Sequence, residues 1–453
     1  MAVDAAVSGG DSVMHAGSSA ASGGPDAGPG TNEPDSAASR DPGKPVLAPA
    51  LDVTTEPADD AVFVFDPNVV RSYDVIVDPA ALEMANMQPS TEAWVPARIW
   101  FEGKQYGPYM MRYKGGAGSF RPPCTTEGYD GAKAGKCSFK LGFDEVDPEL
   151  RFFGLKSLNF QSMNNDDSLL RERLGYSLFR DFGVAAPRAT HARVSFNGVY
   201  EGLFALVEMI DGRFTRARFA DGGEGNVYKE AWPDQDDPDF YLGQLRTNED
   251  ENPSVDGMLQ LHAAVARGGS AVSEFIDPAY TMRYLAVDRV ITNDDGIFHF
   301  YCKLDGSSPP RNHNFYWYEA ERGGQFWLIP WDLDQSFHAT SWAHIAIEWS
   351  APAACICTQV GVSAQSPASC DPMVSTFIEW LPDYEAQVDA FLSGPFAASK
   401  VDEKLETWAD QLESAVDEAS AAGRVPSVSH WRDAIEELQD EIASARQHRG
   451  APY

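Results

Sequence analysis

The sequence contains no long apolar run and comparatively few basic residues. Its densest apolar stretch, at residues 326–331, is far shorter than the roughly 18 consecutive apolar residues that a membrane-spanning helix needs. Lysine and arginine number 35 against 68 aspartates and glutamates, so the net charge is −33. Nucleic-acid phosphates and anionic lipid surfaces would repel such a chain. We therefore expect neither a transmembrane segment nor a nucleic-acid partner.

No internal repeat, collagen-like triplet or heptad period runs through the 453 residues. Apolar residues make up 43% and aromatic residues 11% of the chain, which is enough for a folded core. Residues 1–55 differ, because Ala, Gly, Ser, Pro and Asp dominate there and such a composition cannot repay the entropy of ordering. We interpret residues 1–55 as a disordered acidic tether and residues 56–450 as the folded domain.

The N-terminus shows no basic segment followed by an apolar one, so no signal peptide is visible. A tether of this composition nonetheless often follows a cleaved export signal. No paired C-x-x-C motif is present, so disulfides are favoured over a zinc site. We expect an extracellular or cell-envelope protein in which Cys124 and Cys137 are bridged, and we leave the other pairings open. The cysteines are Cys124, Cys137, Cys302, Cys355, Cys357 and Cys370.

Strand patterns dominate the first half of the domain and helical patterns the second. Alternation of apolar and polar residues predicts strands at 61–66, 72–77, 93–102, 109–114, 136–143, 193–196, 202–208, 315–318 and 326–332. Helical spacing predicts helices at 169–182, 258–267, 278–293, 404–422 and 430–447. Asn197-Gly198 is typical of a hairpin turn. The order predicts a two-lobed α+β fold, with a strand-rich N-lobe and one main helix at about 60–210 and a mostly helical C-lobe at about 211–450.

Oxygen-bearing side chains occur where rigid elements can aim them. Asp332 and Asp334 follow an apolar strand directly, and Asn314 stands next to another. Mg²⁺ prefers one or two carboxylates with substrate phosphates completing its shell. Asp295 follows a predicted helix and could accept a proton from a hydroxyl, whereas its neighbour Asp294 would be a solvated cap. In a chain this acidic, however, acidic pairs are mostly solvated caps and turns, so their spacing alone does not establish a metal site.

A series of short motifs gives a stronger signal because the motifs occur in one order. Among them are Arg112-Tyr113-Lys114-Gly115, Lys136-Cys137-Ser138-Phe139-Lys140, Leu170-Arg171-Glu172, Asn293-Asp294-Asp295-Gly296 and Pro330-Trp331-Asp332-Leu333-Asp334. Over roughly residues 90–340 the chain resembles the spore coat protein H (CotH) kinase family. The resemblance implies an atypical protein-kinase-like fold and transfer of the ATP γ-phosphate to Ser or Thr hydroxyls of proteins outside the cytosol.

The resemblance also implies roles for individual residues. Asp295 resembles the catalytic aspartate, which orients or deprotonates the acceptor hydroxyl. Asp332 and Asn314 resemble the ligands of Mg²⁺ or Mn²⁺, with Asp334 as a second candidate. The resemblance implies that a turn with Lys114, Gly115, Gly116 and Ser119 covers the nucleotide phosphates. A phosphate-binding lysine, either Lys140 or Lys136, would pair with Glu172. Glu208 would contact the adenine or ribose, and Lys229 would lie in the same cleft.

Three departures from the family pattern affect the expected geometry. His338 follows Phe337 where the family usually has Gly, the stretch between Asp295 and His313 is longer than usual, and the glycine turn has an extra residue. The partner implied is a protein with Ser or Thr acceptors, and the chain itself is expected to be a monomer. Two alternatives stay open. One is a transferase that moves AMP or ligates an amino acid, and the other is a non-catalytic adhesion or coat-assembly module.

Overall fold

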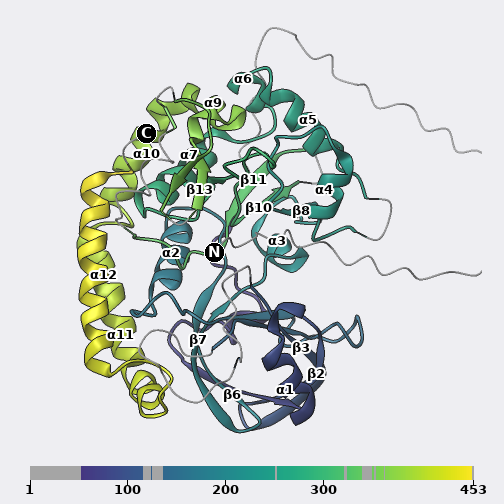
Figure 1. The fold of residues 1–453 in the computed structure, drawn as a ribbon, viewed down its shortest axis with the longest axis vertical. Helices are drawn as coiled ribbons and strands as arrows, with labels where there is room; N and C mark the ends of the chain where they lie inside the picture. The colour runs from purple at the N-terminus through teal and green to yellow at the C-terminus, as the bar shows by residue number, and fades with distance from the viewer. Residues whose placement is uncertain are drawn as a thin grey trace, which may run out of the picture.

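The computed structural model describes residues 53–115, 124, 136–249, 253–320, 324–338, 349–350, 353–361 and 363–450. Most of the predicted tether and the predicted nucleotide contacts Gly116 and Ser119 lie outside these residues. No helix within them is long and apolar enough to cross a membrane. The fold is α+β, as predicted, with a strand-built part at one end and a mostly helical part at the other (Figure 1).

In the described part of the chain, seven strands close into a barrel in the order β1-β2-β3-β4-β5-β7-β6. Strand β6 lies parallel to β1, and the other neighbours are antiparallel. Closure pairs the edges that an open sheet would expose. The strands are β1 (Arg71–Val77), β2 (Val95–Phe101), β3 (Lys104–Tyr113), β4 (Phe139–Gly142), β5 (Ser157–Gln161), β6 (Ala189–Phe196) and β7 (Val199–Val207).

Aromatic rings fill the barrel interior. Phe139 and Phe160 stack with ring centroids 4.5 Å apart, and Phe196 and Phe204 meet Phe139 edge-on. Pairs of this kind add roughly 1 kcal/mol each beyond the burial of their area. The interior of the barrel is therefore a packed core. A binding or catalytic site on the barrel would have to lie on the outward faces of its strands.

Strand β7 separates two hydrophobic cores. Phe204 and Leu206 belong to the barrel core, whereas Leu203, Ala205 and Val207 belong to the core of the helical part. Successive side chains of a strand point to opposite faces, so one strand serves both cores. This arrangement ties the end of β7 firmly to the helical part, where the candidate site is found.

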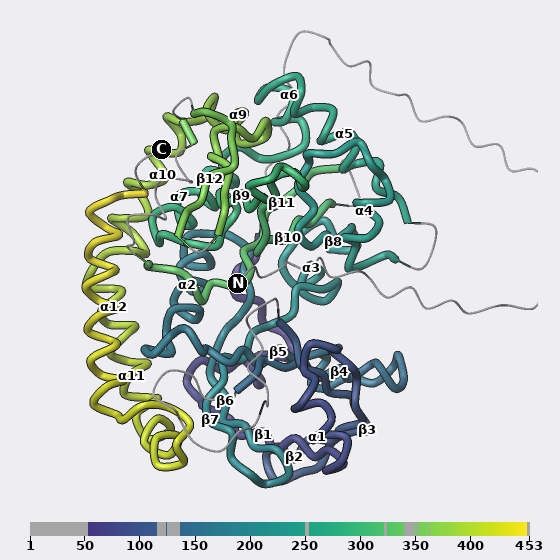
Figure 2. The backbone as a smooth tube through the Cα atoms, in the orientation of Figure 1, coloured from purple at the N-terminus to yellow at the C-terminus, as the bar shows by residue number. Residues whose placement is uncertain are grey.

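The helical part surrounds a small sheet in the order β11-β10-β8, and a second small sheet has the order β12-β13-β9 (Figure 2). Helix α2 (Arg171–Asp181), predicted as the main helix of the N-lobe, packs Leu174 and Leu178 into the core of the helical part. The other elements are α1 (Pro79–Met87), α3 (Gly212–Arg218), β8 (Asn226–Lys229), α4 (Pro238–Gln244), α5 (Asp256–Val265), α6 (Gly269–Val272), α7 (Pro278–Val290), β9 (Phe300–Tyr301), β10 (Phe315–Glu319), β11 (Phe326–Pro330), β12 (Thr358–Val360), β13 (Ser363–Ser366), α9 (Pro372–Phe377) and α10 (Leu381–Ser393).

Two long helices, α11 (Ala398–Ala421) and α12 (Val428–His448), run side by side along one flank from the helical part towards the barrel (Figure 1). Arg193 of β6 pairs with Glu418 of α11 at 2.8 Å. On α12, the indole N–H of Trp431 donates to the carbonyl of Ser168, just before α2, at 2.9 Å. The helix pair therefore contacts both parts of the fold.

Most predicted elements are present with shifted ends, and the Asn197-Gly198 turn joins β6 to β7 with φ of +51° and +79°. The strand predicted at 61–66 is wrong. Residues Asp60–Val62 form a 3₁₀ turn there, because the Asp59 side chain accepts a hydrogen bond from the Ala61 N–H and caps it. Strand β4 is shorter than predicted and begins only at Phe139.

The described cysteines are all in disulfides, and none is free. The predicted bridge between Cys124 and Cys137 is confirmed. The pairings left open are Cys302–Cys357 and Cys355–Cys370. The first of these attaches the segment that carries β12 to the end of β9, next to the candidate site.

Candidate active site

Three side chains hold the carboxylate of Asp295, which lies in the turn after α7. Its Oδ1 accepts hydrogen bonds from the Tyr301 hydroxyl at 2.5 Å and from His313 Nε2 at 2.8 Å, while Oδ2 accepts from Asn314 Nδ2 at 2.7 Å. Burial raises the pKa of Asp295, but the hydrogen bond and charge of His313 outweigh it and hold the pKa below its ordinary value. The carboxylate is therefore ionised at neutral pH and fixed in one orientation.

The turn that carries Asp295 requires glycine at position 296. A Cβ at Gly296 would lie 2.6 Å from Asn293 Nδ2 and 2.7 Å from Asp288 Oδ1, which are themselves hydrogen-bonded at 2.9 Å. Asp294 differs from its prediction as a solvated cap. Its side chain is buried, and burial, reinforced by the charge of Asp295, raises its pKa to about 7.

Asn314 and Asp332 lie at adjacent strand ends in the small sheet. Asn314 precedes β10 and Asp332 follows β11, and the Trp331 N–H donates to the Asn314 carbonyl at 3.2 Å. Both residues have positive φ, +64° at Asn314 and +54° at Asp332. For residues other than glycine this conformation is strained and is concentrated at functional sites. The structure therefore brings the predicted metal ligands next to Asp295, to which Asn314 is hydrogen-bonded.

Glu172, in the first turn of α2, faces the same group of charges. It is 2% exposed, and neither carboxylate oxygen has a hydrogen-bond partner among the described residues. Burial, with the charges of Asp332 and Asp334, raises its pKa well above the ordinary value. For Asp334, burial and the charge of Asp332 raise the pKa to about 8. These carboxylates repel one another, so the region would gain stability from an added cation.

Lys114, which follows β3, is the barrel residue whose charge interacts with Glu172 and Asp332. Its Nζ donates to Gln161 Oε1 at 2.9 Å and lies 5.5 Å from the centre of the Trp331 ring. Burial lowers the pKa of Lys114 to about 8 although both carboxylates act in the opposite direction. Lys114 is predicted to lie in a turn over the phosphates, and in the structure its charge interacts with Asp332 and Glu172. The adjacent Gly115 has φ of +146°.

The two lysines left open as phosphate contacts lie in different surroundings. Lys140 on β4 is in register with Arg112 and Asn159 on the barrel's outward face, and its charge interacts with Lys114. Lys136 precedes β4, and its Nζ donates to the Leu203 carbonyl at 2.6 Å. The prediction that both lysines share one face of a strand is therefore wrong, because Lys136 lies before β4 whereas Lys140 lies within it.

Lys229 at the end of β8 lies opposite Tyr316 of β10 in the small sheet. Burial lowers its pKa, but Tyr316, Glu230 and Asp332 outweigh burial and raise it. Lys229 therefore stays charged at neutral pH and faces the acidic group from the helical part.

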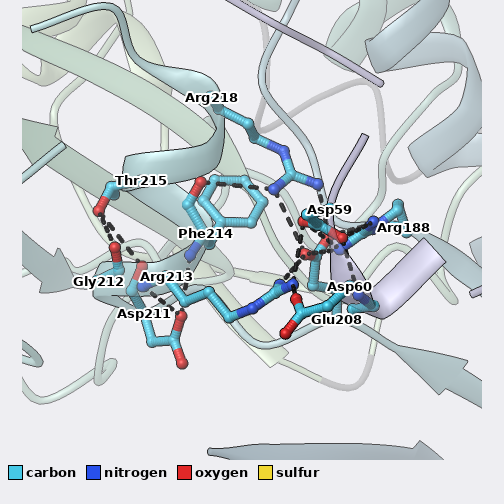
Figure 3. Close-up of polar contacts among 11 residues, drawn as sticks. Asp59, Asp60, Arg188, Glu208, Asp211, Gly212, Arg213, Phe214, Thr215 and Arg218 are labelled. Carbon is cyan, nitrogen blue, oxygen red and sulfur yellow. Dashed lines mark hydrogen bonds and ion pairs between the residues drawn. The ribbon is translucent and has the colours of Figure 1, made fainter. Parts of the chain in front are cut away.

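Glu208, expected at the adenine or ribose, is instead enclosed by arginines (Figure 3). Arg188 contacts Oε1 at 2.6 Å and Arg218 contacts Oε2 at 2.5 Å, while Arg213 lies 3.8 Å from Oε1. Burial raises the pKa of Glu208, but Arg218 and Arg188 outweigh it and lower the pKa to about 2. The carboxylate is 1% exposed, so in this structure it is not accessible to a nucleotide.

Sequence reasoning missed Tyr301, Gln161 and Tyr176. Tyr301 lies on β9, inside the stretch that appeared in the sequence as an unusually long connection. The Tyr176 hydroxyl accepts a hydrogen bond from the Asp332 N–H at 2.9 Å. Helical spacing would have placed Tyr176 one turn after Glu172, on the same face of α2, which is the signal that could have found it.

Comparison with known proteins gives three findings. The family model described as CotH kinase protein matches residues 112–449. The inner spore coat protein H of Bacillus subtilis (strain 168) is 24% identical over 205 residues, which are 41% of this chain and 51% of that protein, so the chain spans about half the length of this relative. A crystal structure of the Helicobacter pylori proinflammatory kinase CtkA matches with 8% identity and a TM-score of 0.29, covering 66% of this chain and 92% of that one. A match at that TM-score carries no structural argument.

Proposed function

This chain belongs to the CotH kinase family, and we propose that it is a secreted or envelope-tethered protein kinase that transfers the γ-phosphate of ATP to Ser or Thr hydroxyls of a protein. The observation that carries the proposal is the fixed, ionised carboxylate of Asp295, bonded to Asn314 beside the strand-end carboxylate of Asp332. Phosphoryl transfer depends mainly on positioning and charge neutralisation, which this arrangement would provide.

The residues fit a metal-bound nucleotide. Both oxygens of Glu172 and Nε2 of Gln161 are buried without partners among the described residues. Each such polar atom costs about 1–3 kcal/mol, which favours a ligand or a rearrangement that satisfies it. The described residues contain no set of three or more His, Cys, Asp or Glu side chains able to hold a metal alone. Mg²⁺ usually needs fewer, because substrate phosphates complete its shell.

Asp332 and Asn314, with Asp334, would therefore hold Mg²⁺ or Mn²⁺ together with the phosphates of ATP. Bound Mg²⁺–ATP would supply the phosphoryl group and neutralise its charge. Lys114 would contact the phosphates from the barrel side and Lys229 from the helical side, as the signs of their charges require. This division of roles corresponds to a two-lobed, kinase-like fold with the site between barrel and helical part.

Asp295 would orient the acceptor hydroxyl and take its proton. His313 and Tyr301 both donate to Oδ1, whereas Oδ2 accepts one hydrogen bond, from Asn314, and keeps its second lone pair for the acceptor. Groups in this role typically contribute about 10²- to 10⁴-fold to the rate. The disulfides and the spore coat relative support an extracellular or coat location for the reaction.

The relative from Bacillus subtilis is named as an inner spore coat protein, which supports a second candidate, a coat-assembly module without catalysis. Intact-mass analysis of the chain incubated with ATP and Mg²⁺, alone and with a Ser- and Thr-containing acceptor protein, separates the candidates. A gain of one phosphate, absent in Asp295→Asn, is the expected result. A gain of AMP would replace the proposal with nucleotide transfer, and an unchanged mass without ATP binding would leave the assembly module.

A further inference from the structure

Arg171 lies next to Glu172 and joins three parts of the chain. Its Nη1 donates to the Ser336 carbonyl at 2.9 Å, and its Nη2 pairs with Glu441 Oε2 of α12 at 2.5 Å. Its main-chain N–H donates to Asp166 Oδ2 at 2.9 Å. The Arg171 side chain is 9% exposed and that of Glu441 is 21% exposed. This ion pair is therefore largely shielded from water, and the Coulomb attraction between its charges is stronger there than at the exposed surface.

Ser336 belongs to a turn, residues 334–338, that contacts the other parts of the site. The Asp294 N–H donates to the Gln335 carbonyl at 3.2 Å, and the Phe337 N–H donates to the Ile291 carbonyl at 2.6 Å. Glu441 Oε1 lies 3.9 Å from His338 Nδ1. The turn that begins at Asp334 is thus bound to the segment before Asp295 and approached by α12.

Helix α2 is linked to the same region by a second route. The Tyr176 hydroxyl accepts from the Asp332 N–H at 2.9 Å, one turn after Glu172. The Trp431 indole of α12 donates to the Ser168 carbonyl, just before α2, at 2.9 Å. A small rotation of α2 would therefore change the position of Glu172 relative to Asp332. Helix α12 contacts the N-terminal end of α2, and this contact opposes such a rotation.

Helix α12 keeps its own place by apolar packing. Ile435, Leu438 and Ile442 are buried in the core of the helical part. Removing one charge from its surface would therefore leave the helix seated. What would change is the charge opposite Arg171, because its buried guanidinium would lose the carboxylate on α12 and keep the Ser336 carbonyl and the nearby Asp166 carboxylate, 3.6 Å away.

We propose that Glu441 is a positioning residue that, acting through Arg171, makes the C-terminal helix a part of the active site. It holds the first turn of α2 and the turn 334–338 in register, so that Glu172, Asp332 and Asp295 face one another. The inference rests on the proposed function for its effect on catalysis. Its structural part, the ordering of these two segments by α12, stands on the contacts alone.

The test uses Glu441→Gln in the full chain, which removes the charge and keeps the shape. Glu436→Gln is the control, because Glu436 is exposed on the same helix. A misplacement of about 1 Å can cost about a hundredfold in rate, so we expect phosphate transfer at saturating ATP to fall at least about tenfold in Glu441→Gln. Amide hydrogen exchange should rise in residues 169–175 and 331–338 and stay unchanged within α12.

A double variant separates positioning from general loss of stability. Lysine cannot bridge several acceptors as the planar guanidinium does, so Arg171→Lys should reproduce the defect, and adding Glu441→Gln to it should cost little more. Should Glu441→Gln fail to fold, Glu441→Asp retracts the charge by one methylene and should give the same pattern in weaker form.

Unchanged exchange in both segments, or an equal defect in Glu436→Gln, would overturn the inference. If the unsubstituted chain transfers no phosphate, the proposed function fails, and the exchange pattern still decides whether α12 orders the two segments. Normal transfer together with raised exchange would show that the contact orders the segments without serving the reaction, which also overturns the positioning role.

Discussion

Replacing Glu208 with glutamine is predicted to destabilise the fold strongly while leaving the proposed nucleotide site intact. The carboxylate is 1% exposed, and Arg188 and Arg218 contact it directly. Arg188 also pairs with Asp59 at 2.9 Å, so the network reaches back to the start of the described chain (Figure 3). Glutamine keeps the shape and one acceptor oxygen but removes the charge that faces the buried Arg218 and leaves Arg188 with Asp59 alone.

The magnitude follows from the pKa of Glu208. Its value of about 2 in the folded protein lies below the ordinary 4.5, and each pKa unit corresponds to about 1.4 kcal/mol. The charge therefore contributes about 3 kcal/mol to folding at neutral pH. Removing one partner from a buried ion pair typically costs about 3–5 kcal/mol, which agrees.

The pH dependence has a definite sign. Because the folded-state pKa is depressed, the stabilisation is fully present above about 4.5 and is lost as pH falls towards about 2. Urea unfolding at pH 7 should show the full difference in the free energy of unfolding between the unsubstituted chain and Glu208→Gln. The same difference should shrink progressively between pH 4.5 and 2.5. Glu224→Gln is the control, since Glu224 pairs with Arg216 on the surface and such pairs contribute little.

Two results would refute this reasoning. One is a loss of less than about 1 kcal/mol at pH 7, which is too small for a broken buried pair, and the other is a difference that does not shrink on acidification. A third measurement concerns the role first predicted for Glu208. Folded Glu208→Gln should keep its ATP affinity, and a selective loss of ATP binding at unchanged stability would restore the contact with adenine or ribose.

Three further predictions concern the site. Asp295→Asn should keep its ATP affinity within a few-fold while the rate of phosphate transfer falls by about 10²-fold or more. As a control, substitution of the exposed Asp305 in Asp305→Asn should leave phosphate transfer normal. Equal transfer by both variants would contradict the role of Asp295. ATP-induced thermal stabilisation should need a divalent metal and vanish with EDTA or in Asp332→Ala, and equal stabilisation with EDTA would count against the metal ligands. The double variant Cys302→Ser/Cys357→Ser opens a bridge with a sequence separation of 55 and should lower the free energy of unfolding by about 4 kcal/mol through chain entropy. Phosphate transfer should be more impaired than ATP binding, because β9 carries a hydrogen-bond donor to Asp295. Unimpaired transfer would show that the bridge does not support the site.

Local sequence patterns predicted the elements well where one face of a strand or helix is buried. The alternation of Val95, Ala97, Ile99 and Phe101 correctly predicted β2, and all four side chains are buried. The same rule failed at Lys136, since it assigns faces only inside a strand and β4 begins three residues later. Alternation also carries no information on closure, so nothing in the sequence indicated that the strands would form a barrel.

For the candidate site, too, the sequence predicted some features correctly and could not predict others. Motif order brought Asp295, Asn314 and Asp332 together correctly as neighbours, because these residues lie at the ends of elements whose pairing is local. The environment of Glu208 could not be predicted, since alternation along β7 does not show that α3, with Arg213 and Arg218, folds back onto the strand end or that Arg188, before β6, joins them. The neighbours of Lys114 and Lys140 depend on strand register, which a single sequence does not specify.

The site draws its charged groups from both parts of the fold, so its geometry depends on how the barrel is seated. Lys114 comes from the barrel, whereas Glu172 and Asp332 come from the helical part. Exposed contacts such as Arg193 with Glu418, whose side chains are 24% and 52% exposed, contribute little to that seating. Buried contacts can contribute more, and Arg424, which follows α11, reaches Glu201 of β7 with both side chains at most 5% exposed. The shared strand β7 and this shielded pair therefore join the barrel to the helical part, so we expect the segment after α11 to contribute to the electrostatics of the site.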